Sequence, residues 1–252
     1  MEGTKAASRV VFPKAPIVEA LLDIGFEPST PIGPDVFEKY HELVKTAYPT
    51  KKEVRASQAD IELSQGLPPK LVTHKDVLDG CHFLSDDKKQ IVQVKMRNFT
   101  ANRLSPYESW EKFQPETQRL WGLLAPLIKQ ARIRRVGLRY INRVEVPLPV
   151  NDLREYILTL PDIPAGLPQA VSEFFMRMVV PDSKREISAA IYHTIEHPKT
   201  GKLPVIFDID VSKTVSIDLN DKSLWTIVEQ LREYKNEIFF HSLTDKAKEL
   251  FK

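Results

Sequence analysis

The chain has little glycine and a single cysteine, and it lacks long apolar runs. Its 252 residues include nine Gly, one Cys and 19 Pro. Glycine is at about half of its usual share of ~7%, which argues against collagen-like and glycine-loop-rich nucleotide folds. One cysteine excludes an internal disulfide framework and a multi-cysteine zinc site, and it is typical of a reducing compartment. No apolar run approaches the ~20 residues that span a bilayer, and the N-terminus lacks a signal-peptide core, so we expect a cytoplasmic protein without a membrane partner.

The charges of the chain almost cancel. There are 36 Lys and Arg against 34 Asp and Glu, which gives a formal net charge of +2. This excess is too small for a chain that binds polyanions over its whole surface, although it is compatible with a local basic patch. The sequence also lacks a phosphate loop, a dinucleotide-binding fingerprint and a nucleophile-elbow motif. We therefore expect no cofactor and assign no catalytic residue.

Apolar periodicity predicts an α+β protein. The expected strands cover residues 17–27, 53–64, 70–73, 80–85, 89–99, 133–146, 171–181, 186–196 and 203–212. The expected helices cover residues 35–48, 107–129 and 151–158, a long segment from residue 220, and a short segment at 243–251. Because short links join consecutive strands, we expect an antiparallel sheet with the helices on one of its faces.

The order of these elements is repeated along the chain. Residues 1–132 read as β-α-β-β-β-β-α and residues 133–252 as β-α-β-β-β-α, with little residue identity between them. This predicts two pseudo-repeated halves that are fused into one structural unit. The order is similar to that of the saddle-shaped fold of TATA-box-binding protein. The similarity covers topology alone, and a shared fold does not imply a shared function.

The first strands of the two halves carry opposite charges on their polar faces. Period-2 alternation places acids on one face of the strand 17–27 and arginines on one face of the strand 133–146. The residues are Glu19, Asp23, Arg135, Arg139 and Arg143, and Lys95 and Arg97 of the strand 89–99 join the cations. If the halves join through their first strands, we expect an ion-pair ladder that fixes their register. In the alternative reading, the arginines present spaced cations to phosphates or to an acidic protein surface.

Three segments carry a resemblance to a known family. PIVEALLDIGFEP lies near the start of the chain, VGLRYINRVEVP in the middle and FFHSLTDKAKELFK at the end. They resemble the hallmarks of a sporadically distributed prokaryotic family with no established biochemical role. The resemblance extends from about Ala15 to the C-terminus, with matching motifs over about forty residues. It implies an accessory or defence-related function and assigns no catalytic residue.

Two patterns are typical of metal sites, and we retain neither as a site. His193 to His197 matches the H-x-x-E-H signature of inverted zinc peptidases. The alternation around it predicts a strand, on which residues four apart lie about 13 Å from each other and cannot share one zinc. Asp208 and Asp210 share a strand face and are weak candidates for Mg²⁺ ligands. No complete nuclease spacing surrounds them, so we prefer a solvated strand face and assign no metal.

The lead hypothesis is a non-enzymatic interaction protein that recognises a macromolecular partner, a protein in the first instance, through a face of its sheet. The first alternative is nucleic-acid binding through Arg135, Arg139 and Arg143. The second alternative is a metal-dependent nuclease that uses Asp208 and Asp210. The expected effect of charge reversal at Arg139 differs among these three hypotheses. It destabilises the fold under the lead hypothesis, weakens salt-sensitive nucleic-acid binding under the first alternative and leaves cleavage intact under the second.

Overall fold

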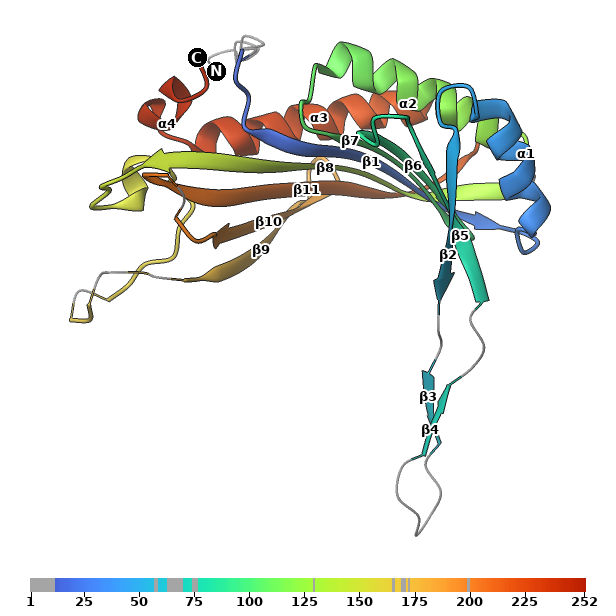
Figure 1. Cartoon of the computed structure of the whole chain (residues 1–252), viewed down its shortest axis with the longest axis horizontal. Helices are drawn as coiled ribbons and strands as arrows, with labels where there is room; N and C mark the ends of the chain where they lie inside the picture. The colour runs from blue at the N-terminus through green and yellow to red at the C-terminus, as the bar shows by residue number, and fades with distance from the viewer. Residues whose placement is uncertain are drawn as a thin grey trace.

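The protein is an α+β protein built on one nine-stranded antiparallel sheet (Figure 1). The computed structural model describes residues 12–56, 59–62, 70–73, 77–128, 130–164, 166–168, 171, 173–198 and 200–252. The strands of the sheet follow the order β2-β5-β6-β7-β1-β8-β11-β10-β9. Their bounds are β1 Ile17–Pro28, β2 Thr50–Ala56, β5 Val77–Leu84, β6 Gln90–Lys95, β7 Asn98–Leu104, β8 Ala131–Pro147, β9 Phe175–Asp182, β10 Ile187–Ile195 and β11 Lys202–Asp218. A separate two-stranded sheet pairs β3 (Ala59–Glu62) with β4 (Lys70–Thr73).

The long helices lie together on one side of the large sheet (Figure 1). Their bounds are α1 Pro34–Val44, α2 Trp110–Leu124 and α3 Ser223–Ser242, and the short helix α4 (Asp245–Glu249) ends the chain. The expected antiparallel sheet with helices on one face is thereby confirmed. No helix of the described residues is long and apolar enough to span a bilayer.

The core fills the space between the helices and the sheet. Alternate side chains of the central strands, such as Leu22 of β1 and Leu138 of β8, are fully buried there. Helix α3 covers β8 and β11 and buries Val228 and Leu231 against them. Each such side chain contributes about 1.5–3 kcal/mol through its removal from water. The opposite face of the same strands carries polar residues, and it is called the polar face below.

The centre of the sheet is the pair formed by β1 and β8. On its other side β1 pairs with β7, the strand that precedes α2, and β8 pairs with β11, the strand that precedes α3. Their antiparallel register sets Leu22 beside Leu138 and Asp23 beside Gly137. The two strands expected to join the halves are therefore direct neighbours, and β8 begins at Ala131, next to the expected boundary after residue 132.

The prediction of a single strand over residues 89–99 is wrong. The structure divides it into β6 and β7, which form a hairpin around a turn at Met96 and Arg97. The alternation of apolar and polar residues continues as far as Arg97 and shifts by only one residue at Asn98, and no glycine or proline marks the turn. Arg97 consequently lies in the turn and does not share a strand face with Lys95. The expected strand 53–64 also falls on two elements, β2 and β3, and part of it lies outside the described residues.

The prediction of a helix over residues 151–158 is wrong, because the structure has one 3₁₀ turn there, η1 (Leu153–Glu155). The backbone after this turn pairs instead with the C-terminal segment. The N–H of Leu158 donates to the carbonyl of Ser242, and the N–H of Thr244 donates to the carbonyl of Tyr156. Because Ile157 is fully buried at this junction, tertiary packing overrides the local helical pattern.

Two glycines give opposite predictions for substitution by alanine. A Cβ at Gly80 would lie 2.2 Å from the carbonyl oxygen of Val94, which belongs to the neighbouring strand backbone. Gly122 is exposed on α2, and a methyl group added to it would meet no atom within 4 Å. We expect Gly80→Ala to lower the free energy of unfolding by about 2 kcal/mol and Gly122→Ala to raise it by about 1 kcal/mol. Urea denaturation of both variants measures the two changes, and a neutral Gly80→Ala would contradict the close approach.

His193 should make the protein sensitive to acid. Its ring is fully buried and stacks on Phe207 with centroids 4.6 Å apart, and its Nε2 lies 2.9 Å from Oγ1 of Thr159. Burial lowers the pKa of His193 to about 4 from its usual 6.5. Between these values the unfolded chain binds the proton and the folded chain does not, so stability falls as the pH falls.

We expect the wild type to lose about 3 kcal/mol of unfolding free energy between pH 7 and pH 4 through His193 alone. Urea denaturation at both pH values measures the loss. His193→Gln keeps a polar atom near Thr159 and removes the titrating imidazole, so it should show a correspondingly smaller loss. An equal pH dependence in the two proteins would remove His193 as its source.

Candidate functional site

The polar face is assembled from side chains of four neighbouring central strands. In the β1–β8 pair Gly25 lies beside Arg135, and in the β8–β11 pair Asp210 lies beside Arg139. Residues that alternate along each strand therefore project to the same side, away from the helices. The arginines of β8 remain partly exposed, with 31–41% of each side chain reached by solvent at Arg135, Arg139 and Arg143.

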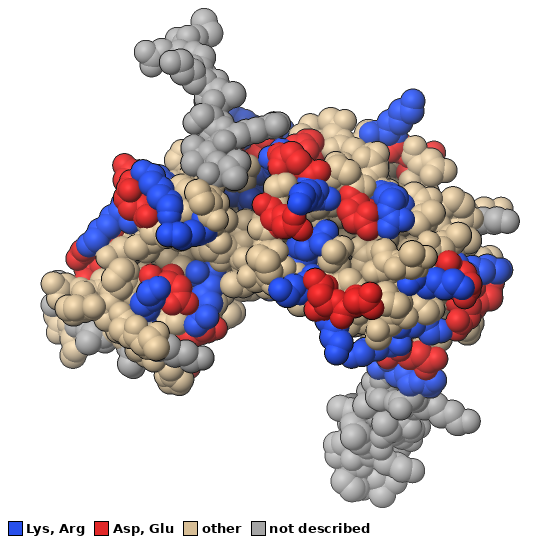
Figure 2. All heavy atoms as spheres, turned by 45° about the horizontal axis from the view of Figure 1, so that its top comes forward, with Lys and Arg blue, Asp and Glu red and all other residues tan. Residues whose placement is uncertain are grey.

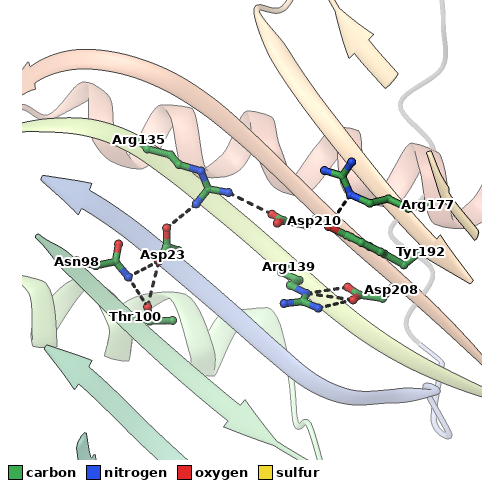
Figure 3. A network of polar contacts seen from close by, with 9 residues as sticks. All are labelled: Asp23, Asn98, Thr100, Arg135, Arg139, Arg177, Tyr192, Asp208 and Asp210. Carbon is green, nitrogen blue, oxygen red and sulfur yellow. Dashed lines mark hydrogen bonds and ion pairs between the residues drawn. The ribbon is translucent and has the colours of Figure 1, made fainter. Parts of the chain in front are cut away.

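Asp23 is the centre of the first group of contacts (Figure 3). Nη1 of Arg135 donates to its Oδ2 at 2.5 Å. On its other oxygen, Asp23 accepts from Nδ2 of Asn98 at 2.6 Å and from Oγ1 of Thr100 at 3.0 Å. The second arm of Arg135 lies 3.5 Å from Oδ1 of Asp210. One guanidinium thus connects β1, β8 and β11, and both Asp23 oxygens are satisfied.

Arg139 and Asp208 form the second group (Figure 3). Nε of Arg139 lies 2.9 and 3.1 Å from the two oxygens of Asp208, and Nη2 donates to Oδ2 at 2.5 Å. Asp208 is 5% exposed, so its charge depends on this pairing. The hydrogen bonds to Asp208 raise the pKa of Arg139. Burial raises the pKa of Asp210, although the charges of Arg135 and Arg139 oppose that rise.

Glu19 and Arg143 have partners other than each other. Glu19 accepts from Nδ2 of Asn102 at 2.6 Å, and Oδ1 of Asn102 accepts from Nε2 of Gln93 at 3.1 Å. Arg143 lies 3.4 Å from Glu145 and 3.1 Å from Glu196. Of the expected ladder between β1 and β8, the structure contains the Asp23–Arg135 contact and the ion pair of Arg134 with Glu27. Arg139 and Arg143 reach acids of β8, β11 and the segment after β10.

Lys95 and Arg97, the two remaining cations of the predicted group, lie at the end of β6 and in the turn that follows it. Nζ of Lys95 lies 3.4 Å from Oδ2 of Asp79, on the neighbouring strand β5. Arg97 is exposed in the turn between β6 and β7. Neither side chain extends the arginine row of β8, so the described structure does not bring all the expected cations into one patch.

The end of the polar face near β9 is aromatic. The guanidinium carbon of Arg139 lies 5.9 Å from the ring centroid of Tyr192, and that of Arg177 lies 5.5 Å from the same centroid. Nε of Arg177 also donates to the hydroxyl of Tyr192 at 3.1 Å. Phe175, which is 71% exposed, stands next to Tyr192 with centroids 6.2 Å apart. Cations and aromatic rings therefore alternate here.

Sequence reasoning missed the neutral polar residues of the network. Asn98, Thr100 and Asn102 occupy alternate positions of β7 and hold the two acids of β1. Their period-2 spacing was the available signal, but it was hidden because residues 89–99 read as one continuous strand. Tyr192 and Arg177 gave no signal, since their roles depend on the register of β9 and β10.

The residues of the two metal-like patterns have other roles in the structure. His193 lies on strand β10, as expected, and His197 follows the strand as an exposed residue. Asp208 is engaged by Arg139, and Asp210 lies beside Arg135. Within the described residues no group of three or more His, Cys, Asp or Glu side chains is arranged to hold a metal ion.

The chemistry of the polar face is that of a neutralised, hydrogen-bonded surface. Arg135, Arg139 and Arg143 each lie next to a carboxylate, and the two acids of β1 accept hydrogen bonds from side-chain amides of β7. These contacts join β1, β8 and β11, and aromatic groups lie beside them. Comparison with known proteins adds no further assignment: no protein-family model matches the chain, and no curated protein matches it.

Proposed function

We propose that the protein is a non-enzymatic interaction protein that recognises another protein through the polar face of its sheet. The observation that carries the proposal is the unequal covering of the two sheet faces. Helices α1, α2 and α3 cover one face (Figure 1), while the other presents the ordered side chains of Asp23, Arg135 and Arg139. A preorganised surface loses little side-chain entropy when a partner binds.

We further propose that the sheet consists of two structurally repeated halves joined at β1 and β8, in a saddle-like arrangement. The strand order supports this, because it reads β1, β7, β6, β5 outward on one side and β8, β11, β10, β9 on the other. In both directions the first strand of a half is followed by its last strand and then by the preceding ones. On the basis of the family resemblance of the three sequence segments, we also propose that this binding serves an accessory or defence-related function.

The charge distribution favours a protein partner over nucleic acid. Each arginine of the polar face in β8 has a carboxylate within 3.5 Å, which reduces the net positive charge offered to a phosphate backbone. Figure 2, in which the helix side is turned toward the viewer, shows that Lys and Arg side chains are interspersed with Asp and Glu on that side as well. Mixed charges of this kind suit specific protein contacts and select against unrelated partners.

The proposal is tested by placing a bulky charge on the polar face. Thr194 of β10 lies on that face between Ile206 and Phe175, and Gln118 is exposed on α2, on the helix side. We expect a protein partner to co-purify with the tagged wild type and with Gln118→Arg, and to be lost with Thr194→Arg. Circular dichroism and thermal unfolding establish that both variants are folded.

Two results would contradict the proposed function. One is a partner that remains bound to Thr194→Arg. The other is recovery of nucleic acid in place of protein, seen in the absorbance ratio of the purified sample and in a filter-binding affinity that falls steeply with salt.

A further inference from the structure

The two edges of the large sheet differ in the side chains that they carry. β2 forms one edge with the sequence TKKEVRA, in which charged residues predominate. Charged side chains on an edge strand discourage pairing with other chains. β9 forms the other edge with the sequence FMRMVVPD, in which Arg177 is the one charge before the terminal Asp182. The β9 edge thus has fewer of the protective charges that the β2 edge carries.

Exposed apolar side chains are frequent in the part of the chain that leads into β9, and three of them, Phe175, Val179 and Val180, lie on β9 itself. In the described part of the chain, nine large apolar side chains are strongly exposed, and seven of them lie between residues 148 and 180. On β9 itself the exposed fraction reaches 71% at Phe175 and 48% at Val179. Both project to the polar face, because they pair with Thr194 and Ala190 on the side of Tyr192. A clustered apolar surface of this kind marks an interaction site.

Pro181 indicates which backbone groups of β9 face outward. A proline is tolerated in an edge strand where its missing N–H would point away from the neighbouring strand. Along an antiparallel strand, alternate residues direct both N–H and C=O to the same side. Arg177 and Val179, which alternate with Pro181, therefore direct these groups to the free edge. They provide donors and acceptors for an added strand.

Arg177 gives this edge its charge preference. Its contacts within the described residues are to Tyr192, a hydrogen bond of 3.1 Å and a cation–π contact, and it has no carboxylate partner there. Arg135, Arg139 and Arg143 all have such partners. Arg177 is exposed and stands between Phe175 and Val179 on one strand face. The edge thus combines two apolar contacts with one uncompensated cation.

We propose that the free edge of β9 binds an extended segment of a partner protein, which adds to the sheet as a further strand and sets an Asp or Glu side chain against Arg177. The inference rests on the proposed function, and it specifies the binding edge and the chemistry of the partner segment. Main-chain hydrogen bonds supply affinity in this mode of recognition, and alternate side chains supply specificity. A charge-assisted bond to Arg177 selects the acidic residue.

A second copy of the chain fits this edge less well. Antiparallel pairing of two β9 strands centred on Arg177 or Met178 would place Arg177 of one copy directly opposite, or diagonal to, Arg177 of the other. Cross-strand neighbours lie about 4.5–8 Å apart, and like charges at that spacing are destabilising. An acidic segment from another protein converts the same position into an attraction.

The test uses a phage-displayed library of random linear peptides, selected on the full-length protein. Selected peptides are then synthesised, and their affinity is measured by fluorescence anisotropy. Arg177→Glu reverses the charge, and Val179→Pro removes an outward donor without removing a bond to β10. Arg97→Glu, at an exposed arginine in the β6–β7 turn, is the matched control. Thermal unfolding verifies that each variant is folded.

We expect the selected peptides to alternate apolar residues with Asp or Glu. Their affinity should fall about tenfold or more on Arg177→Glu and on Val179→Pro and stay unchanged on Arg97→Glu. A Lys in place of the peptide's acidic residue should restore binding to Arg177→Glu.

Three results would overturn the edge proposal. These are peptides without a common acidic position, binding that withstands both β9 variants, and a wild-type dimer that Val179→Pro converts to a monomer in light scattering. If the natural partner is lost on Thr194→Arg and retained on both β9 variants, the polar-face function stands and the edge proposal fails. If the natural partner stays bound to Thr194→Arg and is lost from both β9 variants, the edge proposal stands and the rest of the polar face is not required for binding.

Discussion

Replacing Lys235 with methionine should stabilise the protein by about 4 kcal/mol at pH 7. Lys235 of α3 is 8% exposed, and its Nζ lies 3.9 Å from the ring centroid of Tyr140. The hydroxyl of Tyr140 lies 2.8 Å from that of Tyr107, and the charge of Arg232 adds to the positive potential. Burial, assisted by Arg232, lowers the pKa of Lys235 to about 7 from its usual 10.5.

The sign of the effect follows from proton binding. Between pH 7 and 10.5 the unfolded chain holds a proton that folded Lys235 has released, so the stability of the wild type rises with pH through this range. Methionine has a similar volume and no charge, so residue 235 of the Lys235→Met variant adds no dependence of stability on pH. The advantage of Lys235→Met should therefore shrink to less than about 1 kcal/mol at pH 10.

Urea denaturation of both proteins at pH 7 and pH 10 measures this difference. Lys112→Met is the control, because its side chain is 68% exposed and its ion pair with Glu108 contributes less than about 1 kcal/mol. A Lys235→Met protein that is less stable than the wild type at pH 7 would show that the contact with the Tyr140 ring outweighs the cost of burying the amine.

Charge reversal at Arg139 should destabilise the protein by about 4 kcal/mol. The partner Asp208 is 8% exposed in its side chain, so it would be left buried, unpaired and facing a second carboxylate. Arg139 also donates all three of the hydrogen bonds that join the pair. The exposure of Arg139 itself, 41%, does not relieve the cost, because the buried partner cannot move to water.

The unfolding free energies of Arg139→Glu and of a matched control measure this effect. Arg134→Glu is the control, since Arg134 and Glu27 are about half exposed and their ion pair contributes less than about 1 kcal/mol. The double variant Arg139→Glu with Asp208→Asn should recover part of the loss, because the like-charge contact is gone. Equal losses at Arg139 and Arg134 would rule out Asp208 as the source of the effect.

The central strands of the sheet were predictable from local pattern. Residues 17–27 and 133–146 alternate apolar and polar side chains over most of their length, with exceptions such as Leu21 and Ile141, and the structure places β1 and β8 there. The positions of the hairpin at Met96 and Arg97 and of the turn at Leu153–Glu155 were not predictable in this way. At the hairpin the alternation shifts by only one residue and no glycine or proline marks the turn. At Leu153–Glu155 the following backbone bonds to a segment almost ninety residues away.

The charged residues of the polar face were identified from sequence, but their pairing was not. Alternation alone placed the acids of β1 and the arginines of β8 on strand faces. The choice of Asp208 as the partner of Arg139 depends on how β11 lies against β8, where the cross-strand neighbour of Arg139 is Asp210. The guanidinium reaches two residues along the strand to the more buried carboxylate.

The amino-acid sequence by itself determined the α+β class, the faces of the long strands and the charges that those faces carry, because side-chain direction along a strand follows from a period of two. Tertiary structure alone decided the strand order, the partners of the arginines and the exposure of β9. Each of these depends on contacts between residues far apart in the chain, and no local pattern encodes the register of such contacts. Composition showed near neutrality, and the fold places the opposite charges within hydrogen-bonding distance of each other.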